Sequence, residues 1–211
     1  MIDATNLFNN WVDLGKDNGM VLNHGPSVEF MLNLIPQDII LKHFSFVDIG
    51  CGNGWVVKKI SQHEKCQFAM GIDGAEKMIK KAKLSDSVSE YLHLDINHLE
   101  SYQPNIDFGL SAFDIVFSME VLYYLKSPEI TLKYIYSKLL KEGGCCIIGI
   151  DHYLENQPSL SWEADLNVSL CTYSISEWKK MFKVAGFNTV KQHQFGQKKD
   201  WSGTLIFYAE K

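Results

Sequence analysis

Residues 46–55 constrain the fold of this chain more than any other stretch. They read Phe-Val-Asp-Ile-Gly-Cys-Gly-Asn-Gly-Trp, an apolar run and an acid followed by three glycines at alternate positions. Val56, Val57 and Ile60 then resume at helical spacing, so the pattern predicts a strand, a tight glycine loop and a helix. This is the first unit of a doubly wound α/β domain. Such glycines serve either a sharp turn or a small polar ligand held close to the backbone, and both explanations stay open for this stretch alone.

The spacing of the glycines narrows the choice of ligand. A dinucleotide fingerprint would need its third glycine at position 55, where this chain has Trp55. The pattern is Asp-x-Gly-x-Gly-x-Gly, which resembles the first motif of the class I S-adenosylmethionine-dependent methyltransferases, in particular the small-molecule enzymes of the ubiquinone and menaquinone biosynthesis group. The resemblance implies a cofactor site that includes Asp48, Gly50, Cys51, Gly52 and Gly54.

Composition limits the partners that we expect. The 211 residues suit one domain with a sizeable core. The net charge is −5, and all 20 basic residues are lysine, so no guanidinium group is available to bind phosphate or guanine in bidentate fashion. We therefore expect no nucleic-acid partner.

Cysteine usage and the hydropathy pattern indicate the compartment. The five cysteines show no Cys-x-x-Cys spacing, and we expect reduced thiols and no metal site. The N-terminus lacks a signal-peptide pattern, and no apolar run approaches the roughly 20 residues of a membrane span. We expect a cytoplasmic protein without a membrane partner.

A second strand is expected over residues 67–73, and it ends in Asp73. In doubly wound folds an acid at this point, about 20 residues past the glycine loop, binds the cofactor ribose. The alternative is that Asp73 caps the next helix, and it can do both. Residues 73–82 are similar to the family's second motif, which favours the ribose role and adds Gly74 and Met78 to the implied cofactor site.

The residues at the ends of the third and fourth expected strands resemble motifs of the same family, and they occur in the same order along the chain. Residues 91–94 form a third strand, after which the resemblance implies that Asp95 binds the adenine amino group and Ile96 packs on the ring. A turn over residues 107–112 leads to a fourth strand at 113–118, whose end implies contacts of Ser118, Met119 and Glu120 with the methionine part of the cofactor. The chain lacks an Asn-Pro-Pro-Tyr motif and a pair of glutamates here, which favours a small-molecule acceptor.

The first 45 residues are expected to form two helices. Phe8 and Trp11 lie at helical spacing, residues 15–19 break the pattern, and a second helix begins at Pro26 or Ser27. These helices either cover one edge of the sheet or form a lid over the cofactor. In the second case Met20, His24 and Trp11 would reach the pocket from a mobile connection.

The last third of the chain is expected to contact the methyl acceptor. A helix from Ser127 is stopped by Gly143, and residues 144–150 form the fifth strand. The segment 151–173 is too long for an ordinary connection, and Trp162 lies within it. Ser174 and Glu177 form a capping box before a helix. Residues 188–195 and 204–209 form a closing hairpin, whose antiparallel strand is typical of the family.

Together these features predict an α/β fold with a doubly wound, seven-stranded, mostly parallel sheet, an antiparallel last strand and an N-terminal helical lid. We expect one methyltransferase domain over residues 1–211, divided into the lid (1–45), a cofactor-binding core (46–150) and a substrate loop with the closing hairpin (151–211). The candidates for an acid or base are His152, Asp151, Tyr124 and His24. His152 has the alternative of a histidine satisfied at a strand end.

The function that follows is in-line transfer of a methyl group from S-adenosylmethionine to a small molecule, with S-adenosylhomocysteine as product and a monomer or homodimer as the assembly. The alternatives are a protein or nucleic-acid methyltransferase and a catalytically silent cofactor-binding subunit. A nicotinamide-linked dehydrogenase is a weaker third alternative because of Trp55.

Overall fold

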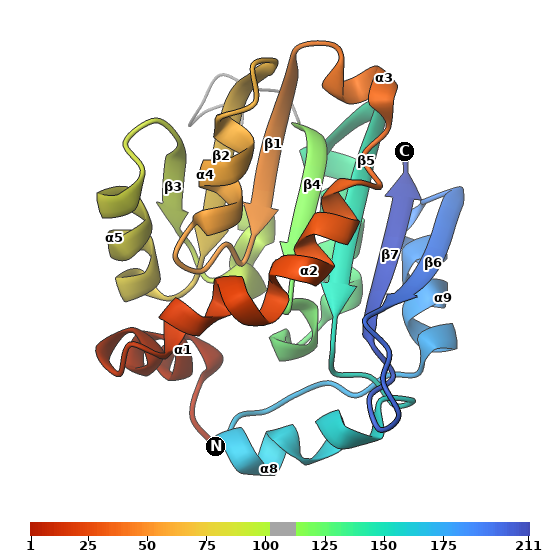
Figure 1. Ribbon diagram of the computed structural model, residues 1–211. Helices are drawn as coiled ribbons and strands as arrows, with labels where there is room; N and C mark the ends of the chain where they lie inside the picture. Colours follow the sequence, from red (N-terminus) through yellow and green to blue (C-terminus); the bar gives the residue numbers. More distant parts are fainter. Residues whose placement is uncertain (102–112) are drawn as a thin grey trace.

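The computed structural model describes residues 1–101 and 113–211, and the turn expected over residues 107–112 lies outside them. The described strands form one seven-stranded sheet in the order β3-β2-β1-β4-β5-β7-β6 (Figure 1). Strand β7 runs antiparallel to both its neighbours, and the other pairs are parallel. The predicted fold class is therefore confirmed. The strands are β1 (Phe44–Ile49), β2 (Cys66–Asp73), β3 (Glu90–His93), β4 (Phe113–Met119), β5 (Leu140–Ile150), β6 (Thr189–Phe195) and β7 (Thr204–Glu210).

Helices cover both faces of the sheet. One face carries α2 (Met20–Leu32), α4 (Trp55–Ser61) and α5 (Glu76–Ser85), and the other carries α7 (Pro128–Tyr134) and α9 (Ile175–Ala185). Helices α1 (Ala4–Asp13) and α8 (Trp162–Leu166) lie beyond the end to which β1 and β5 point (Figure 1). The shorter elements are η1 (Lys16–Gly19), α3 (Gln37–Ile40), η2 (Ile96–Ser101), η3 (Leu122–Tyr124), η4 (Ile135–Leu139) and η5 (Gln157–Ser161).

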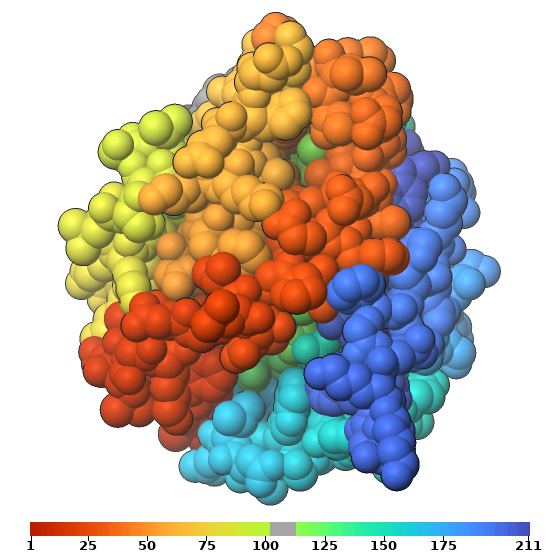
Figure 2. Space-filling model, viewed as in Figure 1, coloured from red at the N-terminus to blue at the C-terminus, as the bar shows by residue number. Residues whose placement is uncertain are grey.

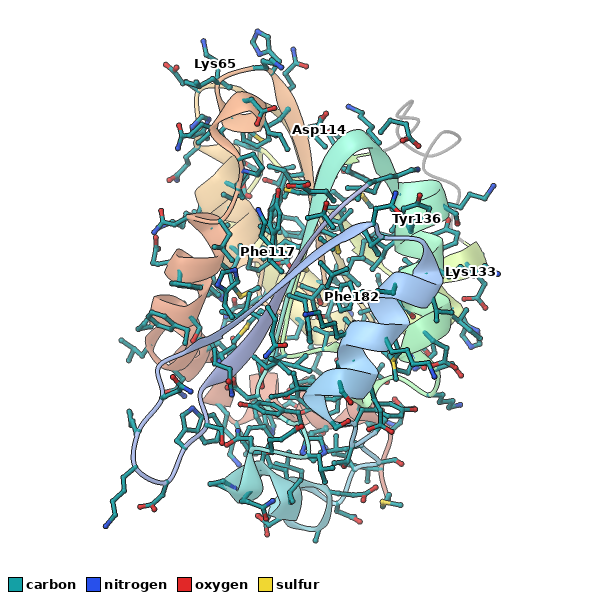
Figure 3. All side chains as sticks on the ribbon, turned by 90° about the vertical axis from the view of Figure 1, so that its right-hand side faces the viewer. Lys65, Asp114, Phe117, Lys133, Tyr136 and Phe182 are labelled. Carbon is teal, nitrogen blue, oxygen red and sulfur yellow. The ribbon has the colours of Figure 1, made fainter. Side chains whose placement is uncertain are left out.

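The core consists of two apolar layers, one on each side of the sheet. All six residues of β1 are buried, as expected for a strand with helices on both faces. Phe117 of β4 faces the layer beneath α2 and α4, whereas Phe182 of α9 packs in the opposite layer (Figure 3). Burying one such side chain stabilises the fold by about 1.5–3 kcal/mol.

Helix α2 differs from the sequence-based expectation. It begins at Met20 rather than at Pro26 or Ser27, and Pro26 lies in its interior. A proline in a helix interior costs roughly 3 kcal/mol, which helical propensity alone would not overcome. The first turn instead packs against the glycine loop, where Met20 Cε lies 2.8 Å from the position that a Cβ on Gly52 would take. The segment expected to be a mobile connection is therefore helical.

The start of β5 is also different. Gly143 was expected to stop the preceding helix, but the strand already begins at Leu140 and Gly143 lies inside it with φ of 78°. Leu140 pairs with Phe113 and Cys145 pairs with Ile115, so extra residues bulge from β5 between these two pairs. The helix ends earlier, through the wide turn η4.

The predicted capping box is confirmed. The Ser174 hydroxyl accepts a hydrogen bond from the Glu177 backbone N–H, and Glu177 Oε2 accepts one from the Ser174 N–H at 2.8 Å. This cap orients α9, which buries Trp178 and Phe182 against the sheet.

We expect Ser174→Ala to lower the free energy of unfolding by about 0.5–2 kcal/mol, because the first turn of α9 loses its cap. Thermal or urea denaturation measures this change. Ser176→Ala, two positions on, is the matched control and should change stability by less than half as much. Equal effects of the two variants would contradict the role of the cap.

Candidate active site

A cavity of about 1100 Å³ lies at the carboxyl ends of the parallel strands. Figure 2 shows it as a hollow bounded by the N-terminal helices, the segment around α8 and the loop between β6 and β7. Most of the predicted cofactor residues line it: Asp48, Gly50, Cys51, Gly52, Asp73, Gly74, Met78, Asp95, Ile96, Met119, Glu120 and Met20. The fold thus brings together residues from four different strand ends.

The glycine loop is held by backbone hydrogen bonds from β2 and by one carboxylate. Gly50 N and Cys51 N both donate to Ile72 O, at 2.7 and 3.0 Å. Asp73 Oδ2 accepts from Gly52 N at 2.8 Å, and its Oδ1 accepts from Ala75 N at 2.7 Å. Asp73 therefore fixes the loop and the entry to α5 together. Each carboxylate oxygen can accept a further bond, so a ribose contact stays compatible with these two.

Two predicted cofactor residues do not line the cavity. A Cβ on Gly54 would lie 2.6–2.8 Å from atoms of Tyr91 and Ala82, so this glycine, at φ of 79°, is required by packing. Ser118 is fully buried, and its hydroxyl donates to Ile49 O at 2.7 Å, which links β4 to β1. The structure gives both residues a structural role.

Asp48 lies beneath the loop and is only 3% exposed. Its Oδ1 has no hydrogen-bond partner among the described residues, although it is buried and the residue lines the cavity. Burial, and secondarily the charge of Asp73, raises the pKa of Asp48 well above its usual range. A buried acceptor of this kind needs a donor, preferably a cationic one, and the ammonium group of an amino-acid tail would provide it.

The candidate acids and bases divide into two groups. Asp151, Tyr124 and His24 line the cavity, but His152 does not. His152 is 1% exposed, and its ring nitrogens Nδ1 and Nε2 lie 2.9 Å from Ser159 O and 2.7 Å from Thr172 Oγ1. The proposal of His152 as a base is therefore corrected: its hydrogen bonds connect the segments before and after α8.

Burial decides the protonation of the remaining candidates. It raises the pKa of Tyr124, which keeps the phenol protonated at neutral pH. It lowers the pKa of His24, so that this imidazole is neutral and able to accept a proton. It raises the pKa of Asp151 to about 6, partly offset by a hydrogen bond with the Thr204 side chain.

An aromatic wall, formed by Tyr123, Trp162 and Trp201, lines the part of the cavity beyond β4 and β5. Trp162 and Trp201 stack with ring centroids 6.1 Å apart and an interplanar angle of 29°. Tyr123 lies next to them, 6.4 Å from Trp162. The sequence alone could not pair Trp162 with Trp201, because they come from segments 39 positions apart.

Lys126 and Lys198 also line the cavity, and neither was singled out in the sequence. Lys198 belongs to the loop between β6 and β7, where its backbone pairs with that of Trp201. Lys126 N donates to Asn97 Oδ1 at 2.9 Å, which places it near the end of β3. Of the two lysines, Lys198 is thus the one that lies beside the aromatic wall.

The N-terminal segment is tied to the glycine loop. Asn53 Nδ2 donates to Asp17 Oδ2 at 3.1 Å, and Lys81 of α5 pairs with the same oxygen at 2.6 Å. The first part of α2 lines the cavity, and Val28 and Met31 farther along pack in the core. The two sequence-based alternatives, a sheet cover and a cavity wall, thus apply to different parts of one helix.

Within residues 1–101 and 113–211, no group of three or more histidine, cysteine, aspartate or glutamate side chains is arranged to hold a metal ion. In the same ranges, none of the helices has the length and apolar character that crossing a membrane requires.

A sheet of this strand order, with its antiparallel β7 and a cavity over the glycine loop, defines the class of S-adenosylmethionine-dependent methyltransferases. Residues 23–192 match the family described as "Methyltransferase domain", so the chain belongs to that family and is an enzyme that uses this cofactor. The observed residues fit the cofactor, because the buried Asp48 offers an unpaired acceptor to its ammonium group and the cavity is rich in carboxylates that suit a sulfonium cation.

Curated relatives include the tRNA U34 carboxymethyltransferases of Haemophilus ducreyi, 34% identical over 116 residues, and of Aliivibrio fischeri, 35% identical over 101 residues. These matches span 52% and 45% of this chain but only 33% and 28% of the relatives. The aligned regions therefore cover about half of this chain and no more than about a third of the length of these relatives.

Solved structures agree with the fold. A chain from the complex of the Haloferax volcanii Trm112 methyltransferase activator with a methyltransferase superposes with a TM-score of 0.82 at 23% identity, over 100% of this chain and 98% of that one. The magnesium protoporphyrin IX methyltransferase of Synechocystis, with bound S-adenosylhomocysteine, gives a TM-score of 0.64 at 15% identity over 93% and 86% of the chains. At these identities the likeness concerns the fold.

The relatives contradict one expectation from the sequence. No nucleic-acid partner was expected, on the net charge and the lack of arginine, yet the curated relatives are named as tRNA carboxymethyltransferases. That expectation was wrong because net charge describes the whole surface. Binding of a base depends on local stacking and on a few well-placed lysines.

We expect Asp73→Asn to weaken binding of S-adenosylhomocysteine at least tenfold, because an amide in place of the carboxylate weakens the bonds to Gly52 and Ala75. Isothermal calorimetry measures the affinity, and the melting temperature reports on folding. Glu76→Gln, in the exposed first turn of α5, is the matched control. Unchanged affinity in Asp73→Asn would argue against a role in cofactor binding.

Proposed function

We propose that this chain is an S-adenosylmethionine-dependent methyltransferase that modifies a base of tRNA. The observation that carries the proposal is the aromatic wall of Tyr123, Trp162 and Trp201. Trp162 already stacks with both Trp201 and His152, and Tyr123 is only 2% exposed, so Trp201 is the ring of the wall on which an unstacked base would stack. Such a contact is worth about 1–3 kcal/mol. The names of the curated relatives support the same class of substrate.

Lysines of the loop between β6 and β7 support binding of the RNA backbone. Lys198 lines the cavity beside Trp201 and is followed by Lys199, while Lys126 lines the same cavity near the end of β3. Lysine binds phosphate as a point charge and does not require the guanidinium group that this chain lacks. We infer that a base enters the cavity while its flanking phosphates stay near these lysines.

We assign residues of the cavity to parts of the cofactor by the hydrogen bonds that each side chain can make. We propose that Asp48 binds the ammonium group, Asp73 the ribose, and Asp95 with Ile96 the adenine, beside Met78 and Met20. When bound, the cofactor supplies a methyl group that its sulfonium makes electrophilic. The chain contributes by orienting the acceptor and excluding water, and such positioning can supply roughly 7–11 kcal/mol of the barrier.

Two broader expectations remain part of the proposal. One is a single methyltransferase domain with the lid, core and substrate segments expected from the sequence. The other is a cytoplasmic location, which suits a tRNA-modifying enzyme and agrees with five free cysteines.

Labelled methyl transfer tests the acceptor class. The protein is incubated with methyl-labelled S-adenosylmethionine and unfractionated tRNA, and the products are treated with ribonuclease or with protease. We expect label that ribonuclease releases, and mass spectrometry of the nucleosides then identifies the methylated nucleoside. Label found in protein or in small metabolites, with none in tRNA, would contradict the proposal.

We expect Trp201→Ala to raise KM for tRNA about tenfold, because a base loses one stacking surface. Trp201→Phe retains a flat ring and should restore most of the affinity. Affinity for S-adenosylhomocysteine should stay unchanged in both variants, since Trp201 belongs to the loop after β6. A KM for tRNA that stays at the wild-type value in Trp201→Ala would argue against stacking.

A further inference from the structure

Two carboxyl groups meet in the cavity at the ends of neighbouring strands. Glu120 follows β4 and Asp151 follows β5, and both line the cavity. The strands pair in parallel with Met119 opposite Gly149, and Glu120 N donates to Gly149 O at 2.9 Å. The sheet itself therefore brings the two side chains together.

The backbone at Glu120 is unusual. Its φ is 61°, a left-handed conformation that costs a non-glycine residue stability and that is concentrated at functional sites. Among the described residues only Asn167 shares this feature without being glycine. Glycine adopts this backbone conformation at no steric cost, so the presence of glutamate indicates that its side chain has a function at this position.

Each of the two carboxyl groups has an oxygen that lacks a partner. Asp151 is 7% exposed, and its Oδ1 is buried with no hydrogen-bond partner in the described part of the chain. The same holds for Glu120 Oε1, whereas Glu120 Oε2 accepts from the Tyr123 hydroxyl at 2.6 Å. Buried acceptors without partners are rare in folded proteins, and these two residues line a cavity. Their partner is therefore expected to be a ligand.

Asp151 lies away from the cofactor loop, because β4 separates β5 from β1 and Asp151 lies beside Thr204 of β7. Glu120 is nearer to the loop, since β4 pairs directly with β1 and Val121 packs against Gly50. The hydroxyl of Tyr123, a residue of the aromatic wall, connects Glu120 to that wall. The pair therefore lies between the cofactor loop and the wall.

We propose that Glu120 and Asp151 together bind the edge of the acceptor base, with Asp151 accepting a hydrogen bond from an N–H group and Glu120 donating one to the adjacent carbonyl or ring nitrogen. This deepens the proposed function and rests on it. It also moves Glu120 from the cofactor site, where sequence resemblance put it, to the acceptor site.

Electrostatics support complementary roles for the pair. Burial raises the pKa of Asp151 to about 6, so it is ionised at neutral pH. Burial, and then the charge of Asp151, raises the pKa of Glu120 well above its usual range, which favours its protonated form. Because Oε2 already accepts from the Tyr123 hydroxyl, we place that proton on Oε1, which has no partner among the described residues. The site thus presents one acceptor beside one donor.

The test uses the full chain, labelled cofactor and unfractionated tRNA, with kcat and KM measured against pH. In the wild type, kcat/KM should fall as the pH falls through about 6, because the protonated, neutral Asp151 is a weaker acceptor than the carboxylate. The other titratable groups around the pair are Asp48, His24, Tyr123, Tyr124 and Tyr153.

Asp151→Asn should raise KM for tRNA about tenfold or more, because it replaces the charged acceptor by a neutral one. It should also abolish the fall of kcat/KM at acidic pH (the acidic limb of the profile), because an amide does not titrate. Glu120→Gln keeps a donor and should retain activity within about threefold. Both variants should bind S-adenosylhomocysteine as the wild type does. Glu142→Gln, an exposed carboxylate at the opposite end of β5, is the matched control.

The outcomes separate the two proposals. If the wild type transfers no label to tRNA, the proposed function fails and this inference fails with it. If transfer occurs but Asp151→Asn keeps the wild-type KM or the acidic limb, only the pair is overturned. A tenfold loss of S-adenosylhomocysteine affinity in either variant, with an unchanged melting temperature, would assign the pair to the cofactor instead.

Discussion

The hydrogen bonds that the Asp73 carboxylate accepts from Gly52 N and Ala75 N connect the glycine loop to the start of α5. Parallel pairing of β1 with β2 brings the strand ends to one edge, and this carboxylate then fixes the loop after β1 to the segment that enters α5. The loop in turn carries Asn53, whose bond to Asp17 holds the N-terminal segment over the cavity. Disturbing one carboxylate would therefore loosen three parts of the site.

Burial of carboxylates governs the chemistry of this cavity. Asp48, Glu120 and Asp151 are removed from water and lack one partner each among the described residues, which is unfavourable without a ligand. A cationic cofactor and an acceptor with N–H groups would both relieve that cost. The same acids would make the site unsuitable for an anionic group at this depth, because no arginine is available to pair with it.

The acceptor side shows how distant segments combine. Trp162 comes from α8, Trp201 from the loop between β6 and β7, and Tyr123 from η3 after β4. The antiparallel insertion of β7 beside β5 returns that loop to the carboxyl end of the sheet, where it meets α8. His152, which sequence reasoning offered as a base, supports this arrangement through Ser159 and Thr172.

The sequence by itself determined the strand, loop and helix around Asp48, the acids that end β2 and β3, and the capping box at Ser174. These follow from local periodicity and from spacing along a single segment. Only the tertiary structure decided that α2 begins before Pro26, that Gly54 and Ser118 face the core, and that Glu120 meets Asp151. The reason is physical: each of these depends on packing between segments far apart in the chain, and that packing outweighs the local preferences on which sequence patterns depend.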